Sequence, residues 1–176
     1  MKVHFIALFA GLILISSLLT ADEPAPENPQ IDFPAFIDLA GEVHNYRKDR
    51  RVTVEEFLEM AQDGNTLILD TRSKANYEIK HIKGAVHLNF SEMTTRDLKE
   101  AIPSKDTRIL IYCNNNFLNN IQPLTLKSAP LALNIPTFIT LYGYGYKNLY
   151  ELGPAIDENE GLIEFESNLE LPLAQN

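Results

Sequence analysis

The sequence of 176 residues contains one cysteine, Cys113, and no tryptophan. A single cysteine excludes an internal disulfide and the clustered thiolates of a structural zinc site. His44 and His87 have no partners at metal-ligand spacing, so no metal is predicted. Glycine-rich phosphate loops and dinucleotide fingerprints are also absent, so no cofactor is predicted. Cys113 is therefore either a buried apolar side chain or a free thiol with a chemical function.

Positive charge is scarce. The chain has 15 Lys and Arg against 24 Asp and Glu, a formal net charge of −9. An acidic surface disfavours nucleic acid and anionic lipid as partners. The one dense group of basic residues, 47–51, is interpreted as a solvated turn, with a binding patch as the alternative.

The longest apolar run, Phe5 to Leu19, is short for a membrane span. It follows Lys2 and ends beside the small-residue sequence Thr20-Ala21, which is typical of a cleaved secretory signal. The sequence thus predicts an exported protein, periplasmic or secreted, without membrane contact after cleavage. An uncleaved N-terminal anchor is the alternative.

Composition divides the chain into four segments. We expect a signal peptide over 1–21, a linker rich in Pro, Glu and Asn over 22–30, a domain over 31–155 and an acidic tail over 156–176.

Short apolar runs alternate with helical patterns through the domain. Thr53 is a good N-cap for a helix with Phe57 and Leu58 on one face. Further helices are predicted over 75–79, 94–101, within 119–133 and over 146–152, and strands over 67–69, 85–89, 108–112 and 137–141. This alternation predicts an α/β fold with a central parallel sheet flanked by helices on both faces. Ligands bind such sheets beyond the carboxyl ends of the strands, where Cys113 follows strand 108–112.

The residues after Cys113 are Asn114-Asn115-Asn116-Phe117-Leu118-Asn119. Asparagine tolerates turn conformations, so this run suits a tight loop. Backbone amides of such a loop bind an anion and favour a thiolate. We therefore predict that Asn114 to Asn119 bind the substrate of Cys113. A buried core cysteine beside an ordinary turn is the alternative.

Two motifs precede this strand: Asp70-Thr71-Arg72 and His81-Ile82-Lys83-Gly84-Ala85. With Cys113 they resemble the rhodanese family over about residues 52–152. The resemblance implies a rhodanese-like fold and a sulfurtransferase chemistry. In that chemistry, Cys113 is the catalytic nucleophile that carries sulfane sulfur as a persulfide. Asp70 and Arg72 are expected to brace the loops, and His81 to stabilise the turn before Gly84.

The loop departs from the family pattern because it carries no Arg or Lys. Each lost charge-assisted hydrogen bond removes roughly 1.5–3 kcal/mol, so use of thiosulfate is doubtful. Asn119 stands where related phosphatases require arginine, which excludes that activity. The sequence predicts an exported sulfurtransferase with a small sulfur donor and a thiol or protein acceptor. The alternatives are a noncatalytic binding or sulfide-sensing module and a thiol redox protein.

Overall fold

The computed structural model describes residues 28–118 and 126–169. The chain divides into two units, residues 1–32 and 33–176. In the first, the Ile31 amide donates to the Asn28 carbonyl and closes a turn. The predicted signal peptide, most of the predicted linker and Asn119 lie outside the described residues. Among the described helices, none is long and apolar enough to cross a membrane.

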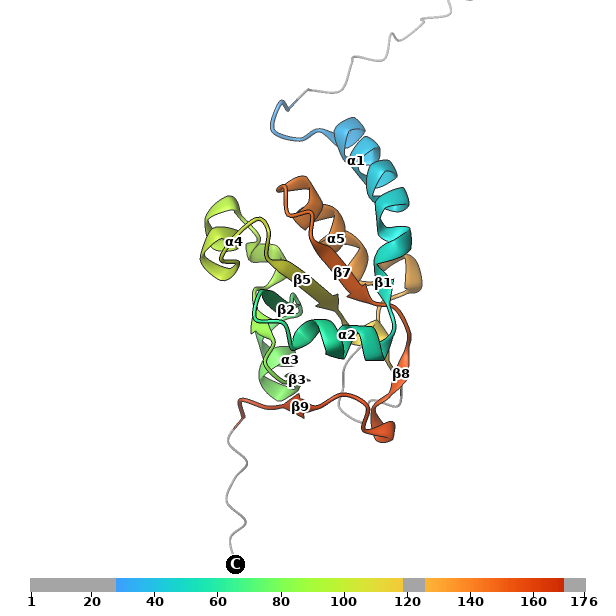
Figure 1. Cartoon of the computed structure of the whole chain (residues 1–176). Coiled ribbons are helices and arrows are strands. Elements are labelled where there is room, and N and C mark those ends of the chain that lie inside the picture. Colours follow the sequence, from blue (N-terminus) through green and yellow to red (C-terminus); the bar gives the residue numbers. More distant parts are fainter. Residues whose placement is uncertain (1–27, 119–125, 170–176) are drawn as a thin grey trace, which may run out of the picture. The chain divides into compact units, whose positions relative to one another are not determined.

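A five-stranded parallel sheet forms the centre of the second unit (Figure 1). Its strands stand in the order β1 (Arg51–Val52), β7 (Leu149–Leu152), β5 (Arg108–Tyr112), β2 (Thr66–Asp70) and β4 (Val86–His87). Along β5, Ile109 and Ile111 face one core cluster, while Leu110 and Tyr112 face the other. This alternation explains the continuous apolar run, because a central parallel strand is buried on both faces.

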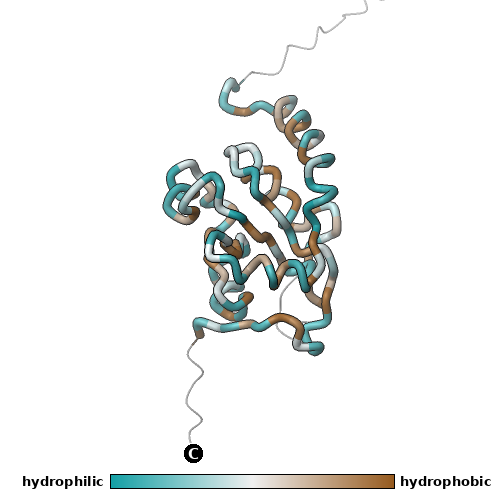
Figure 2. Tube along the Cα trace, viewed as in Figure 1, coloured by the Kyte–Doolittle hydropathy of each residue, from teal (hydrophilic) through white to brown (hydrophobic). Residues whose placement is uncertain are grey.

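Helices cover both faces of the sheet. One core cluster includes residues of α1 (Phe33–Tyr46), α4 (Thr95–Ala101) and α5 (Asn134–Gly143). The other includes residues of α2 (Val54–Ala61), and Tyr77 of α3 (Lys74–Ile79) packs against it. Hydrophobic residues concentrate along the central strands between these layers (Figure 2). The predicted α/β class, with helices on both faces, is confirmed.

Helix α2 begins where the sequence predicts. The Thr53 hydroxyl accepts from the Glu56 amide at 3.2 Å, and the Glu56 carboxylate accepts from the Thr53 amide at 2.9 Å. This capping box satisfies two amides that a helix start leaves unpaired. Phe57, one turn later, is fully buried.

Two predicted elements are wrong. The predicted strand 137–141 lies within α5, where Thr137, Phe138 and Leu141 share the buried helix face. Their β-branched and aromatic composition favours a strand locally, but packing on the sheet outweighs it. The predicted helix 146–152 contains β7 instead. Leu149 and Leu152 enter opposite core clusters, which an odd separation allows in a strand but not on one helix face.

Two other predicted elements are shorter than expected. The predicted strand 85–89 is reduced to β4, and the described part of 119–133 contains only a 3₁₀ turn. Short 3₁₀ helices occupy Arg47–Arg50, Phe90–Glu92, Asn114–Asn116, Ala129–Leu131 and Glu158–Glu160.

The basic segment forms the first of these turns. Arg47 Nη2 lies 2.6 Å from Oε1 of Glu151, a buried residue on β7. The Arg50 guanidinium lies 4.2 Å from the ring centre of Tyr46 and 5.0 Å from that of Tyr150. The segment is a turn, but these two arginines pack against the domain rather than standing free in solvent.

The segment from residue 156 packs against the domain over its described part. Strand β8 (Ile156–Asp157) pairs in parallel with β6 (Phe117–Leu118), and β9 (Phe165–Glu166) pairs antiparallel with β3 (His81–Ile82). Ile163, between β8 and β9, is buried. The acidic composition suggested a separate tail, but the described part of this segment contains two paired strands and a few buried apolar side chains.

Candidate functional site

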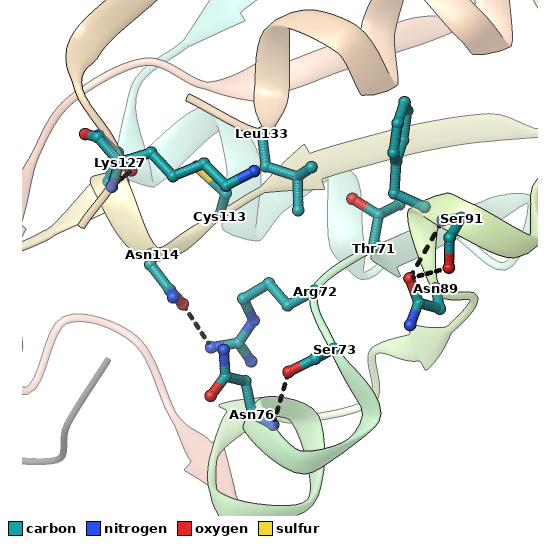
Figure 3. Close-up of a pocket in the computed structure, with 12 residues that line it drawn as sticks. Thr71, Arg72, Ser73, Asn76, Asn89, Ser91, Cys113, Asn114, Lys127 and Leu133 are labelled. Atoms are coloured by element: carbon teal, nitrogen blue, oxygen red, sulfur yellow. Dashed lines mark hydrogen bonds between the residues drawn. The ribbon is translucent and has the colours of Figure 1, made fainter. Parts of the chain in front are cut away.

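A pocket of about 320 Å³ opens beyond the carboxyl ends of β2, β4 and β5 (Figure 3). This is the edge where ligands bind parallel α/β sheets. The volume lies at the lower end of small-molecule sites. Twelve residues line it: Thr71, Arg72, Ser73, Asn76, Asn89, Phe90, Ser91, Cys113, Asn114, Asn115, Lys127 and Leu133.

Cys113 follows β5 directly and keeps an extended backbone. The residue is 2% exposed, yet it belongs to the pocket lining. Its amide donates to Asn116 Oδ1 at 3.0 Å, which fixes the start of the loop. The sulfur thus meets the pocket from a rigid position at the end of the central strand.

The three consecutive asparagines have three different partners. Asn114 Oδ1 accepts from Arg72 Nη1 at 3.0 Å. The Asn115 side chain exchanges two hydrogen bonds with the backbone of Lys127. Asn116 is buried and donates to the carbonyls of Leu152 and Pro154. The run therefore ties the loop to three separate parts of the domain.

Two of the loop amides predicted to bind an anion are used within the loop itself. The Asn116 amide donates to the Cys113 carbonyl and the Phe117 amide to the Asn114 carbonyl, so the turn uses these groups internally. Phe117 is 2% exposed in the core, and Leu118 is 47% exposed outside the pocket. Of the residues predicted to bind substrate, Asn114 and Asn115 line the pocket. Asn116, Phe117 and Leu118 do not.

Asp70 and Arg72 form a buried ion pair under the pocket. Arg72 Nε donates to both carboxylate oxygens, at 2.9 and 3.0 Å, and Nη2 donates to Oδ2 at 2.6 Å. Nη2 also donates to the Lys80 carbonyl, and the Tyr112 hydroxyl donates to Asp70. The guanidinium thus links β2, the end of α3 and the cysteine loop.

This network sets two pKa values. Burial acts to lower the pKa of Arg72, but the hydrogen bonds and charge of Asp70 outweigh it and raise that pKa above its ordinary value. Burial, followed by the negative charge of Asp70, raises the pKa of Tyr112. Arg72 is therefore a permanent cation and Tyr112 a neutral donor.

His81 lies outside the pocket lining and is 1% exposed. Its Nδ1 lies 2.7 Å from the Tyr77 carbonyl and its Nε2 lies 3.2 Å from Glu166 Oε1. The same carboxylate oxygen accepts from the Gly84 amide at 2.9 Å. Gly84 has φ of +80°, a conformation that favours glycine. His81 and Gly84 thus hold β9 against the turn after β3.

The sequence reasoning missed Lys127. It lines the pocket 14 positions after Cys113, so the pocket has a side-chain cation that the cysteine loop itself lacks. One signal was available, since Lys127 is the only Lys or Arg between Arg108 and Lys147. Among the residues that the structure describes, no Asp or Glu lines the pocket, although the whole chain has 24. Within the described residues no cluster of three or more His, Cys, Asp or Glu could hold a metal.

A model of the rhodanese-like domain matches residues 53–152. The tRNA uridine(34) hydroxylases of Streptococcus sanguinis strain SK36 and Streptococcus suis strain 05ZYH33 are each 38% identical over 64 residues. Those residues cover 34% of this chain and 19% of each hydroxylase. The chain therefore spans about a fifth of the length of these relatives.

Two solved structures are similar in fold. The BH2092 protein of Bacillus halodurans has a TM-score of 0.53 at 16% identity, over 73% of this chain and 85% of that one. A thiosulfate sulfurtransferase of Pseudomonas aeruginosa has a TM-score of 0.50 at 16% identity, over 77% of this chain and 23% of that one. At this identity the likeness concerns the fold alone.

Proposed function

The chain belongs to the rhodanese-like domain family, and from this premise we propose that it is an exported sulfurtransferase that carries sulfane sulfur as a persulfide on Cys113. One observation carries the proposal. Cys113, the only cysteine, lies at the carboxyl end of the central strand in a pocket whose described lining contains Lys127, a cation outside the Asp70–Arg72 ion pair, and no carboxylate. Such a pocket favours anions, and both a thiolate and a persulfide are anionic.

The reaction requires no cofactor. The Cys113 thiolate attacks the sulfane sulfur of the donor, and a sulfur–sulfur bond forms. The donor's bond to that sulfur breaks, and its electron pair leaves with the donor anion. An acceptor thiolate then attacks the outer sulfur of the persulfide and returns Cys113 to the thiolate.

The pocket lining is compatible with a wider range of sulfur donors than the sequence of the cysteine loop suggested. Lys127 provides a side-chain cation where none was expected. Thiosulfate therefore belongs among the donors to be tested, beside mercaptopyruvate and polysulfide. Phe90 and Leu133 give the pocket apolar walls that suit an organic donor or acceptor.

We propose no tRNA substrate. The hydroxylases are named for a tRNA uridine, but the matched segment covers a fifth of their length. A net charge of −9 disfavours the counterion release that drives nucleic-acid binding.

The second candidate is noncovalent binding of a small anion in the same pocket. The exposure of Cys113, only 2%, favours this alternative because a nucleophile must reach its substrate. In this alternative the fold and the charge of the pocket are the same, but no sulfur–sulfur bond forms on Cys113.

Intact-mass spectrometry separates the two candidates. The protein is exposed to thiosulfate, mercaptopyruvate and polysulfide, and its mass is compared before and after reduction. We expect the wild type to gain one reducible sulfur atom and Cys113→Ser to gain none. A wild type that gains no sulfur from any donor contradicts the enzyme proposal and leaves anion binding.

Export has its own test. The intact mass of the protein purified from the extracytoplasmic fraction is expected to correspond to cleavage after Ala21. Recovery of the full-length chain in the membrane fraction would instead establish an anchor.

A further inference from the structure

The two cations of the pocket are in different situations. The Arg72 guanidinium is committed to Asp70, the Lys80 carbonyl and Asn114. The Lys127 ammonium has no ion pair or hydrogen bond with any described residue, and the residue is exposed. Lys127 is thus the one lining cation whose charge is not already balanced within the described part of the chain.

Lys127 is held at the pocket by Asn115. Asn115 Nδ2 donates to the Lys127 carbonyl at 2.7 Å, and the Lys127 amide donates to Asn115 Oδ1 at 3.2 Å. A carboxamide has a donor and an acceptor on separate atoms, so Asn115 fixes the lysine backbone at two points. This pairing joins the loop of Cys113 to a segment 12 residues further along the chain.

The Lys127 side chain also has the right direction. In Figure 3 it extends toward Leu133, and Lys127, Leu133 and Cys113 all line the pocket. A lysine on a solvated surface is the ordinary alternative, but this one belongs to the lining of a pocket without Asp or Glu. An ammonium in such a place attracts a negatively charged group of the ligand.

We propose that Lys127 binds the oxyanion group, sulfonate or carboxylate, of the small molecule that reacts at Cys113, and that Asn115 positions Lys127 for this contact. The proposal rests on the proposed function for the identity of that molecule as a sulfur donor. It makes Lys127 a specificity-determining residue supplied from outside the cysteine loop. Phe90 and Leu133 then contact the uncharged part of the ligand.

Alkylation of Cys113 by two matched reagents tests the charge preference. Iodoacetate and iodoacetamide alkylate a thiolate by the same displacement of iodide, but only the first carries a carboxylate. Lys127→Gln should lower the ratio of the iodoacetate rate to the iodoacetamide rate about 5- to 20-fold, since an exposed ammonium is partly screened by solvent. Lys127→Arg should keep most of the wild-type ratio. Lys99→Gln, the same charge change at an exposed site outside the pocket, should leave the ratio unchanged.

Asn115 needs a test that a merely structural role would not pass. Asn115→Ala should lower the same ratio about 2- to 5-fold, because Lys127 loses its backbone anchor. If Asn115 acts through Lys127, the double variant with Lys127→Gln is no worse than Lys127→Gln alone. Additive losses would overturn the positioning role.

A binding measurement tests the role of Lys127 independently of the proposed sulfurtransferase activity. Methanesulfonate is titrated into Cys113→Ser, with and without Lys127→Gln, and followed by NMR shifts. Weaker binding in the double variant supports the inference, even where no persulfide ever forms. Equal binding in both, or an unchanged alkylation ratio in Lys127→Gln, overturns it and leaves the persulfide proposal standing.

Discussion

Strands β2 and β7 flank the central strand β5, and each carries a buried carboxylate. Asp70 on β2 is 0% exposed and Glu151 on β7 is 1% exposed. The Asp70 carboxylate accepts from two guanidinium nitrogens of Arg72 and from the Tyr112 hydroxyl. Glu151 has Arg47 Nη2 at 2.6 Å, but neither of its oxygens makes a hydrogen bond of good geometry among the described residues.

This difference shows that burial alone does not determine what a charge does in a sheet. A buried carboxylate with several charge-assisted donors is held rigidly, and Asp70 thereby holds Arg72 under the pocket. A buried carboxylate with one imperfect contact loses hydration without full compensation. Burial accordingly raises the pKa of Glu151, although Arg47 and Arg51 act to lower it.

The largest effect is expected from Asp70→Asn. The change leaves the Arg72 guanidinium buried beside a neutral amide, which we expect to reduce the free energy of unfolding by about 3–5 kcal/mol. Urea unfolding followed by circular dichroism measures this loss. A loss below about 1 kcal/mol would show that the network is replaceable.

Arg47→Met is expected to have a smaller effect. It removes the one ion pair that Glu151 makes among the described residues, but Arg47 is itself 29% exposed, so we expect a loss of about 1–3 kcal/mol at neutral pH. At acidic pH the loss should shrink, because lowering the pH toward the raised pKa of Glu151 protonates the carboxylate and removes its need for a cation. The same urea unfolding at both pH values checks this, and a loss that does not depend on pH contradicts it.

The fold was predictable from the sequence only in part. Strands β2 and β5 were predictable because apolar residues on both faces mark a central parallel strand. The local sequence pattern could not show that α5 is a helix and that β7 is a strand. β7 is only four residues long, and α5 is rich in residues that favour strands. In both, contacts with distant elements decide the structure.

The candidate site was also predictable only in part. The placement of Cys113 at a strand end, with Asp70 and Arg72 at the end of the adjacent strand, follows from local motifs and sheet topology. The pairing of Asn115 with Lys127 joins residues 12 positions apart across an irregular segment. No periodicity connects such residues, so only the absence of other cations from 109 to 146 could have drawn attention to Lys127.

Glu151→Gln tests the raised pKa through the dependence of stability on pH. Between the ordinary pKa of 4.5 and the raised pKa, the folded wild type holds a proton that the unfolded chain has released. Its stability therefore falls as pH rises through this window, by about 1.4 kcal/mol for each pH unit between the two pKa values. Glutamine cannot titrate, so the variant should gain stability relative to the wild type across the window and keep that gain above it. Parallel pH profiles for the two proteins would contradict the assignment.

The smallest effect is expected where the charge pair is exposed. Asp63 Oδ2 lies 3.0 Å from Arg108 Nη1, and the two side chains are 50% and 29% exposed. Asp63→Asn is the same chemical change as Asp70→Asn. Water can solvate Arg108, which also donates to Thr66 Oγ1, so we expect a loss of about 0.2–1 kcal/mol. The loss should decrease further in about 1 M salt, which screens exposed charges but not the buried Asp70 pair. Equal losses at the two aspartates would mean that the hydrogen-bond network around Asp70 adds nothing to its ion pair.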